Sequence, residues 1–330
     1  MAMRCRRAVG PLARALAAGL LVGWLAGCGG GAGDSGSDAS ARTAVEHDAL
    51  PGTGRPLVKI GDKNFTEQFV LGELYAEALK AQGYSVVLNR DIGPTEVVMQ
   101  ALGSGRLSIY PEYVSTWNTA VAHDRRSFRS AQGAIAAARD YAGAHGFTLL
   151  DPTPFSDTGA IAVRRAFAED QQLRTIGDLR KVAQSLALGA PPQFQQSPGG
   201  LLRVEQSYGF VPAAVKALPI GLQYQALDQD TIQAAYVSTT DGALRGGPYR
   251  LLKDPRKAFG WGQAMPVVPT KVLAAEGPAF ARTINRVSAL LDLGTIRRLN
   301  AAVDIHNQDP ATVAARFLRA HGLIPAQPSS

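Results

Sequence analysis

The residue types best suited to chemistry lie where predicted strands run into helices within residues 57–119. Lys63 and Asn64 follow an apolar strand predicted at residues 57–60, and a helix is predicted from Asn64 to Ala81. The first amides of a helix lack partners within it and carry partial positive charge, so a lysine beside them favours an anionic group of a ligand. A solvated lysine at a strand end is the alternative, and the residues alone leave both interpretations open.

The sequence also predicts how that helix begins and ends. Asn64 stands three residues before Glu67, which is the spacing of a capping box. We therefore expect Asn64 to cap the helix, and Gly83 to end it.

The sequence lacks the patterns of the common catalytic centres. It contains no nucleophile elbow, no P-loop and no dinucleotide fingerprint. The five histidines are scattered, without metal-ligand spacing or a cysteine partner: His47, His123, His145, His306 and His321. We expect no catalysis, no cofactor and no metal.

The elements that must position the candidate residues alternate between strands and helices. Further strands are predicted at residues 85–89, 107–110, 148–150, 160–164, 186–189, 235–237, 249–252 and 265–268, with helices between them and after Lys271. This alternation predicts an α/β architecture with largely parallel sheets. We expect lobe 1 at residues 56–157 plus 265–330, lobe 2 at residues 158–264, and a ligand cleft between them at the carboxyl ends of strands.

The N-terminus has the composition of an export segment. A basic stretch with four arginines, an apolar stretch at residues 15–25 and small residues before Cys28 resemble a bacterial lipoprotein signal at residues 1–27, which implies cleavage and lipidation at Cys28. The apolar stretch is too short for a bilayer span. A plain secretory signal with an unrelated cysteine is the alternative. Residues 28–55 are small and polar, which predicts a flexible tether to the membrane.

Composition and charge exclude a nucleic-acid partner. Hydrophobic residues make up 46% and charged residues 18% of the 330 residues, as in soluble globular proteins, and the length suits two compact lobes. The formal charge of +7 falls to +3 once the four arginines of residues 1–27 are removed. No basic run with interleaved aromatics remains.

Several motifs together resemble the substrate-binding proteins of ABC importers for glycine betaine, choline and related quaternary ammonium compounds. They are GDKNFTEQFVLGELYAEALKAQGY, IGPTEVVMQAL, IYPEYVST, PFSDTGAIAVR, FQQSPGGLLRVEQSYGF and STTDGAL, in this order over residues 57–324. The resemblance implies a two-lobed, type II periplasmic-binding-protein fold. Each lobe would be a mixed, mainly parallel sheet flanked by helices, with the ligand in the interlobe cleft.

In that family an aromatic cage holds the cationic head, because a trimethylammonium group has no hydrogen-bond donor and is recognised by aromatic faces. The resemblance assigns Lys63 to the family's lysine, Tyr113 to a cage tyrosine, Thr116 to a nearby hydroxyl and Asp157 to an acidic position beside the cage.

Other positions depart from the family's pattern. Gly159, Ser238 and Gly262 stand where aromatics are common, and Ser197 stands where some members carry an arginine. We expect a rebuilt box in which Tyr113, Tyr236 and Trp261 line the cleft, with Ser197 offering a hydroxyl. Ordinary core packing of the aromatics, and a helix cap at Ser197, are the alternatives.

The sequence thus predicts a monomeric, lipid-anchored receptor outside the cytoplasm, in a periplasm or on a cell surface. It would carry a small zwitterion or quaternary ammonium compound to an ABC permease and its ATPase. Two alternatives remain: the same fold with another small zwitterion, such as an amino-acid derivative or ergothioneine, and a sensor or interaction lipoprotein without transport.

Overall fold

The computed structural model describes residues 49–326 except 125 and 197–198, so Cys28, Ser197 and the predicted signal segment lie outside the described residues. The strands are β1 (Val58–Gly61), β2 (Val86–Asn89), β3 (Tyr110–Tyr113), β4 (Phe147–Leu149), β5 (Gly159–Arg164), β6 (Ala187–Ala190), β7 (Ala214–Ala217), β8 (Ala234–Ser238), β9 (Tyr249–Leu251) and β10 (Ala264–Pro269).

The longer helices are α1 (Thr66–Ala81), α2 (Thr95–Gly103), α4 (Ala131–Ala144), α7 (Leu201–Tyr208), α10 (Pro278–Ser288), α11 (Leu293–Asp304) and α12 (Pro310–Ala320). The shorter ones are α3 (Val114–Thr116), α5 (Arg165–Asp170), α6 (Pro192–Gln196), α8 (Leu222–Asp228), α9 (Thr270–Glu276), a π-helical turn η1 (Trp117–Val121) and the 3₁₀ turns η2 (Ile176–Lys181), η3 (Ala183–Ser185) and η4 (Gly242–Leu244). None of the helices within the described ranges is long and apolar enough to cross a membrane.

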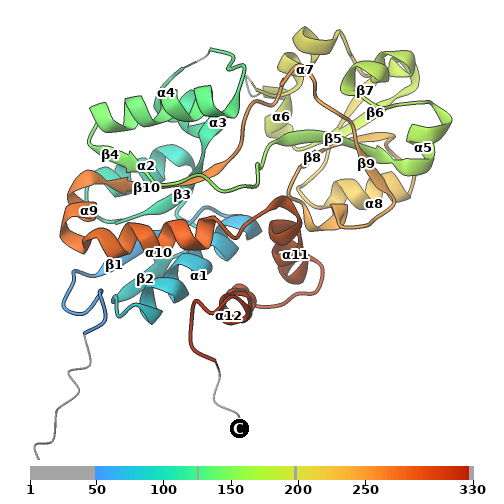
Figure 1. Ribbon diagram of the computed structural model, residues 1–330. Coiled ribbons are helices and arrows are strands. Elements are labelled where there is room, and N and C mark those ends of the chain that lie inside the picture. The colour runs from blue at the N-terminus through green and yellow to red at the C-terminus, as the bar shows by residue number, and fades with distance from the viewer. Residues whose placement is uncertain (1–48, 125, 197–198, 327–330) are drawn as a thin grey trace, which may run out of the picture. The chain divides into compact units, whose positions relative to one another are not determined.

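These strands form sheets in two parts of the chain. β1 pairs with β2, β10 lies between β3 and β4, and the five-stranded sheet has the order β7-β6-β8-β5-β9. The sheets are mixed: β1–β2 and the pairs of β6 are parallel, whereas both pairs of β10 and both pairs of β5 are antiparallel. The chain enters the five-stranded sheet at β5 and, after β9, returns to the three-stranded sheet at β10 (Figure 1).

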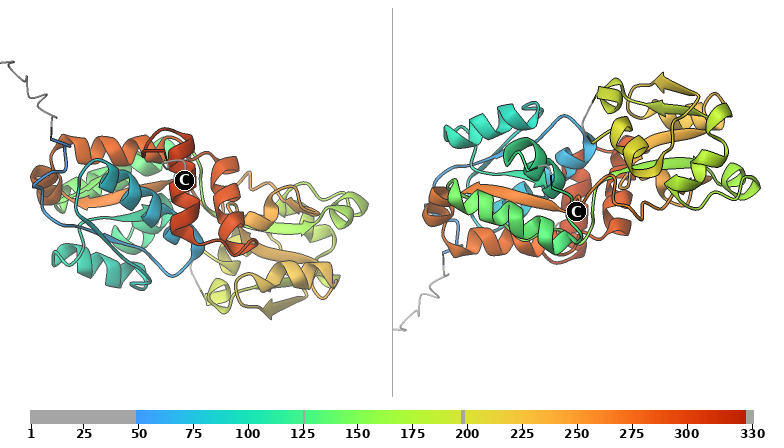
Figure 2. Two further views of the ribbon diagram at one scale, coloured as in Figure 1. Left: turned by 90° about the horizontal axis from the view of Figure 1, so that it is seen from below. Right: turned by 90° about the horizontal axis from the view of Figure 1, so that it is seen from above.

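The segment before β5 and the segment before β10 connect the two groups of sheets and helices. These two crossing segments run side by side. Ser156 and Gln263 form an antiparallel bridge, and the Asp157 N–H donates to the Gly262 carbonyl at 2.8 Å. Figure 2 shows both extended segments between the two groups of sheets and helices. This arrangement places Asp157 at the junction, where both groups can reach it.

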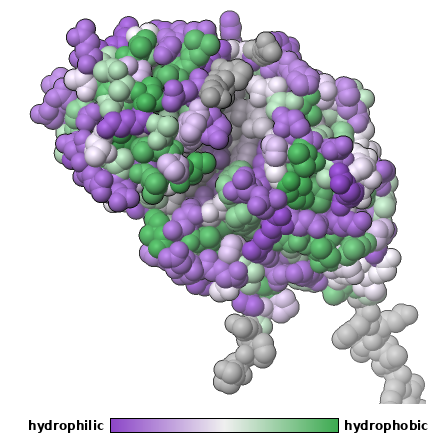
Figure 3. Space-filling model, turned by 180° about the vertical axis from the view of Figure 1, so that it is seen from behind, coloured by the Kyte–Doolittle hydropathy of each residue, from purple (hydrophilic) through white to green (hydrophobic). Residues whose placement is uncertain are grey.

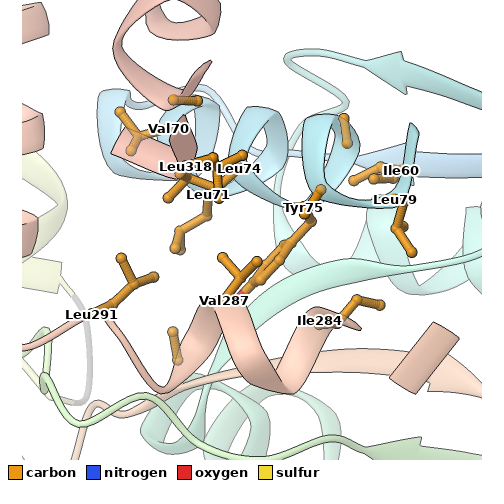
Figure 4. Close-up of a cluster of buried hydrophobic side chains, with 14 of the residues drawn as sticks. Ile60, Val70, Leu71, Leu74, Tyr75, Leu79, Ile284, Val287, Leu291 and Leu318 are labelled. Atoms are coloured by element: carbon orange, nitrogen blue, oxygen red, sulfur yellow. The ribbon is translucent and has the colours of Figure 1, made fainter. Parts of the chain in front are cut away.

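Helix α1 is the centre of the larger core. Apolar residues cover most of its circumference, which is typical of a helix enclosed by other elements. Leu71, Leu74 and Tyr75 face Ile284 and Val287 of α10 (Figure 4). Packing on this helix fixes the position of its first turn, which carries the candidate site.

Two local expectations prove wrong. The N-cap of α1 is Phe65, without a side-chain cap, rather than Asn64. The reason is that the Glu67 side chain is engaged elsewhere, while Gln68 Oε1 accepts the Lys63 N–H at 3.4 Å. The third strand begins at Tyr110 rather than spanning residues 107–110, because its hydrogen-bonding partner is the distant β10.

Candidate ligand-binding site

Tyr113 and Phe65 form an aromatic pair beside the first turn of α1. Tyr113 ends β3 and is only 6% exposed, while Phe65 is partly exposed. Their rings stack with centroids 6.1 Å apart and an angle of 29° between the planes. The Tyr113 hydroxyl donates to Glu67 Oε1 at 2.8 Å, so one face of this lobe presents two rings beside a carboxyl group.

Helix α11 supplies a second hydrogen-bond donor to Glu67. Asn300 Nδ2, on α11, donates to Glu67 Oε2 at 3.0 Å and to the Thr240 carbonyl at 3.1 Å. Burial raises the pKa of the Glu67 carboxyl, and hydrogen bonds from Thr240, Tyr113 and Asn300 oppose that rise. The carboxyl is thus held in place while its charged form is costly.

Asp157 is the second carboxyl of this cluster. It accepts a hydrogen bond from the Ser238 hydroxyl, which also contacts Thr240 Oγ1 at 2.9 Å. Burial raises the pKa of Asp157 well above its usual range, and the charge of Glu67 raises it further. The charged form of Asp157 is therefore disfavoured both by burial and by the neighbouring Glu67 carboxyl.

Tyr236 lies in β8 and packs against two phenylalanine rings. Its ring stacks on Phe194 with centroids 4.2 Å apart and tilts against Phe259 at 5.7 Å. Burial and the charge of Asp157 raise the pKa of Tyr236 to about 12, which shows that the ring lies within electrostatic reach of that carboxyl. A Cβ at Gly159 would lie only 2.5 Å from the Tyr236 ring. Because glycine has no side chain, the Tyr236 ring can occupy the space that an aromatic residue at position 159 would fill.

Gly262 is also explained by its neighbours. A Cβ there would lie 1.6 Å from the Asp157 carbonyl oxygen. The crossing segments approach too closely for any side chain, so an aromatic residue cannot occupy this position.

Lys63 is placed differently from the expectation of a lysine available to an anionic ligand group. Its Nζ lies 2.7 Å from both carboxylate oxygens of Glu112 and 2.9 Å from Thr95 Oγ1, and the side chain is buried. The ion pair offsets the lysine's charge. Asn64, next to it, is exposed and does not cap α1.

Trp261 and Thr116 are not joined to the carboxyl cluster by any hydrogen bond or ring contact within the described residues. The Trp261 indole donates to the Phe128 carbonyl at 3.0 Å and packs on the core that contains Trp117, with Lys257 Nζ 4.5 Å from its ring. Thr116 is half-buried in α3. Ser197 lies outside the described residues.

The sequence interpretation missed most of the polar cluster. The spacing of Asn64 and Glu67 assigns Glu67 to a capping box, and no sequence pattern indicates a role for Phe65, Phe194 or Phe259. Asn300 lies in a segment whose apolar residues have helical spacing. No local pattern in that segment indicates that the Asn300 side chain is buried against Glu67. One available signal was the run NFTEQ, in which an aromatic and an acidic residue flank the expected helix start.

Comparison with known proteins identifies relatives over the same residues. Residues 56–320 match the family described as the substrate binding domain of ABC-type glycine betaine transport systems. The chain is 32% identical over 278 residues to the glycine-betaine-binding protein of Pseudomonas aeruginosa, covering 81% of this chain and 88% of that protein. It is 31% identical over 288 residues to the glycine betaine-binding protein YehZ of Escherichia coli, covering 83% and 93%.

A solved structure supports the same assignment. The crystal structure described as a glycine betaine/carnitine/choline ABC transporter matches with a TM-score of 0.73 and 25% identity, covering 81% of this chain and 99% of that one. The fold is therefore the two-lobed α/β fold of type II periplasmic binding proteins, and the chain belongs to the substrate-binding domains of ABC-type glycine betaine transport systems.

Proposed function

We propose that this protein is the extracytoplasmic receptor of an ABC importer and that its two lobes close on a quaternary ammonium cation. The proposal is supported by the hydrogen bond between Tyr113 and Glu67 and by the buried Asp157 carboxyl, which lies within electrostatic reach of Glu67, Tyr113 and Tyr236. The relatives named for glycine betaine support the class of ligand. One face of the molecule is hollowed, as suits a protein that encloses a small solute (Figure 3).

The chemistry of the cluster fits a monocation. A trimethylammonium group cannot donate a hydrogen bond, so aromatic faces and nearby negative charge are the means of attracting it. A buried charge is costly unless an opposite charge pairs with it. Because the Glu67 carboxyl disfavours the charged form of Asp157, we propose that the two carboxyls share one proton and that the remaining negative charge matches a single positive head group.

The same cluster favours a cationic ligand over a zwitterion. The carboxylate of a betaine needs a cation or several donors, and the ammonium of Lys63 is already paired with Glu112. We propose that a choline-like cation binds more tightly than glycine betaine. Lobe closure would bend the segments near residues 155–160 and 260–267, which bring Asp157 beside Gly262.

The membrane attachment is a separate part of the proposal. The lipoprotein-like segment before Cys28 supports a lipid anchor on that residue and a tether of about 28 residues. The mass of the chain extracted from bacterial membranes checks this, since an unlipidated N-terminus there would contradict it.

The aromatic part of the site is tested by comparing two tyrosine substitutions. Tyr113→Leu keeps apolar volume but removes the ring, and we expect choline affinity to fall roughly 2- to 30-fold, the worth of one cation–π contact of about 0.5 to 2 kcal/mol. Tyr141→Leu is the control, because Tyr141 packs in α4 against Trp117 and His145. Isothermal titration calorimetry measures both.

If Tyr113→Leu and the wild type bind choline with equal affinity, the proposed aromatic cage is contradicted. Thermal melting of each variant without ligand separates a loss of binding from a loss of folding. Binding of free amino acids, with no response to any quaternary amine, would contradict the proposed ligand class.

A further inference from the structure

A cavity away from the ligand-binding site gathers three arginines. It has a volume of about 270 Å³ and is lined by Arg165, Leu244, Tyr249, Arg250, Leu251 and Arg297. The first five come from lobe 2, whereas Arg297 comes from α11, which packs against η4. None of the lining residues belongs to the carboxyl cluster or its aromatic rings.

Two of the three guanidinium groups lack a carboxylate partner. Arg250 is paired with Glu169 at 2.9 Å, but neither Arg165 nor Arg297 forms an ion pair within 4.0 Å with any described residue. The Arg165 guanidinium bonds only a backbone carbonyl, that of Tyr249, at 3.5 Å. Two of the three guanidinium groups around the cavity thus have no paired carboxylate among the described residues.

Arg297 is half-buried and is held by a backbone contact. Its Nε donates to the Thr239 carbonyl at 2.8 Å, which fixes the side chain. Its two terminal nitrogens form no hydrogen bond with the described residues. Burial lowers the pKa of Arg297, and the charges of Tyr224 and Asp241 partly oppose this. Asp241 is itself engaged by the Tyr224 hydroxyl at 2.7 Å and by the Ser238 amide at 3.2 Å.

Three like charges around one cavity repel one another unless an anion lies among them. A guanidinium offers donors in a planar fork that matches the oxygens of a tetrahedral or planar oxyanion. A small oxyanion occupies only a part of a cavity of this size, so ordered water can share the space.

We propose that this arginine cavity is a binding site for a small polyatomic oxyanion of charge −2, of the class of sulfate and hydrogen phosphate. Arg165 and Arg297 supply the uncompensated charge, and Arg250 a further donor. Because Arg297 belongs to α11 and the other arginines to lobe 2, the bound anion would link the two lobes. Arg297 also holds Thr239, which lies between Ser238 and Thr240 of the carboxyl cluster.

Calorimetric titration of the purified chain with sodium sulfate tests this proposal, with ionic strength held constant by sodium chloride. We expect one sulfate per chain, and at least a tenfold loss of affinity in Arg165→Gln, because a charge-assisted contact is removed. Arg106→Gln is the matched control, since Arg106 is an exposed arginine of lobe 1 whose guanidinium contacts Ser104. We expect it to bind sulfate as the wild type does.

Arg165 is exposed, so its substitution leaves the core intact, and a melting curve verifies folding. Titration with hydrogen phosphate at pH 8 should give the same stoichiometry and the same loss in Arg165→Gln. The proposal is overturned if sulfate binds no better than chloride at equal ionic strength, or if Arg165→Gln and Arg106→Gln bind it equally.

Discussion

Asp62 shows how one buried residue beside the site sets a pH dependence. It is fully buried, its Oδ1 accepts the Asp91 N–H at 2.8 Å, and its Oδ2 has no partner among the described residues. Burial raises the pKa of Asp62 to about 6 from 3.8. A folded state that holds a proton more tightly than the unfolded chain loses stability as the pH rises from about 4 to about 6.

Asp62→Asn removes that titration, because an amide stays neutral and still accepts the Asp91 N–H. We expect the fall in the free energy of unfolding between pH 4 and pH 7 to shrink by roughly 2 to 3 kcal/mol, the size of a two-unit change in pKa. Urea unfolding at both pH values measures this. The exposed Asp140→Asn is the control, and the same fall in Asp62→Asn as in wild type would contradict the account.

At the scale of residues, the sequence indicated some of the site residues but not the residues that they contact. Tyr113, Asp157 and Tyr236 lie around one cluster, as a shared binding role requires. The ion pair of Lys63 with Glu112 and the contact of Glu67 with Asn300 join residues far apart in the chain. No local spacing encodes such contacts, so they become visible only in the folded structure.

At the scale of elements, the close approach of the crossing segments determines the geometry of the site. The segment ending at Asp157 and the segment containing Gly262 are hydrogen-bonded at 2.8 Å. A Cβ at position 262 would overlap the Asp157 carbonyl oxygen. The segments must therefore separate to accommodate even a methyl group.

Gly262→Ala should destabilise the protein by roughly 1 to 3 kcal/mol, the range of an overpacked site, and should weaken choline binding because Asp157 moves. Gly143→Ala is the matched control, since a Cβ at Gly143 in α4 meets no atom within 4 Å. That change should be neutral or stabilise by up to about 1 kcal/mol. Chemical denaturation and calorimetry test both variants, and equal stability of the two would refute the role of the contact.

Secondary structure was predictable where local pattern and packing agree. The helix predicted over residues 64–81 occurs as α1 (Thr66–Ala81), and most of its apolar residues are buried. β3 begins three residues later than expected because β10 selects its register.

At the scale of the whole molecule, the resemblance predicted the family and the fold class, since its motifs extend over most of residues 57–324. Which buried charges pair with one another could not be predicted, because such pairs join residues that lie far apart in the chain. Lys63 is paired with Glu112, whereas burial raises the pKa of Glu67 and of Asp157.

The measurement that tests this most directly is calorimetric titration of the wild type with choline and with glycine betaine between pH 5 and pH 8, in buffers of different ionisation enthalpy. Burial raises the pKa of Asp157 well above its usual range, and a bound cation favours the charged carboxylate, so we expect binding to release a proton. The account predicts that choline affinity rises with pH, that a proton is released on binding, and that choline binds more tightly than glycine betaine. Affinity that is independent of pH, with no proton released, would contradict it.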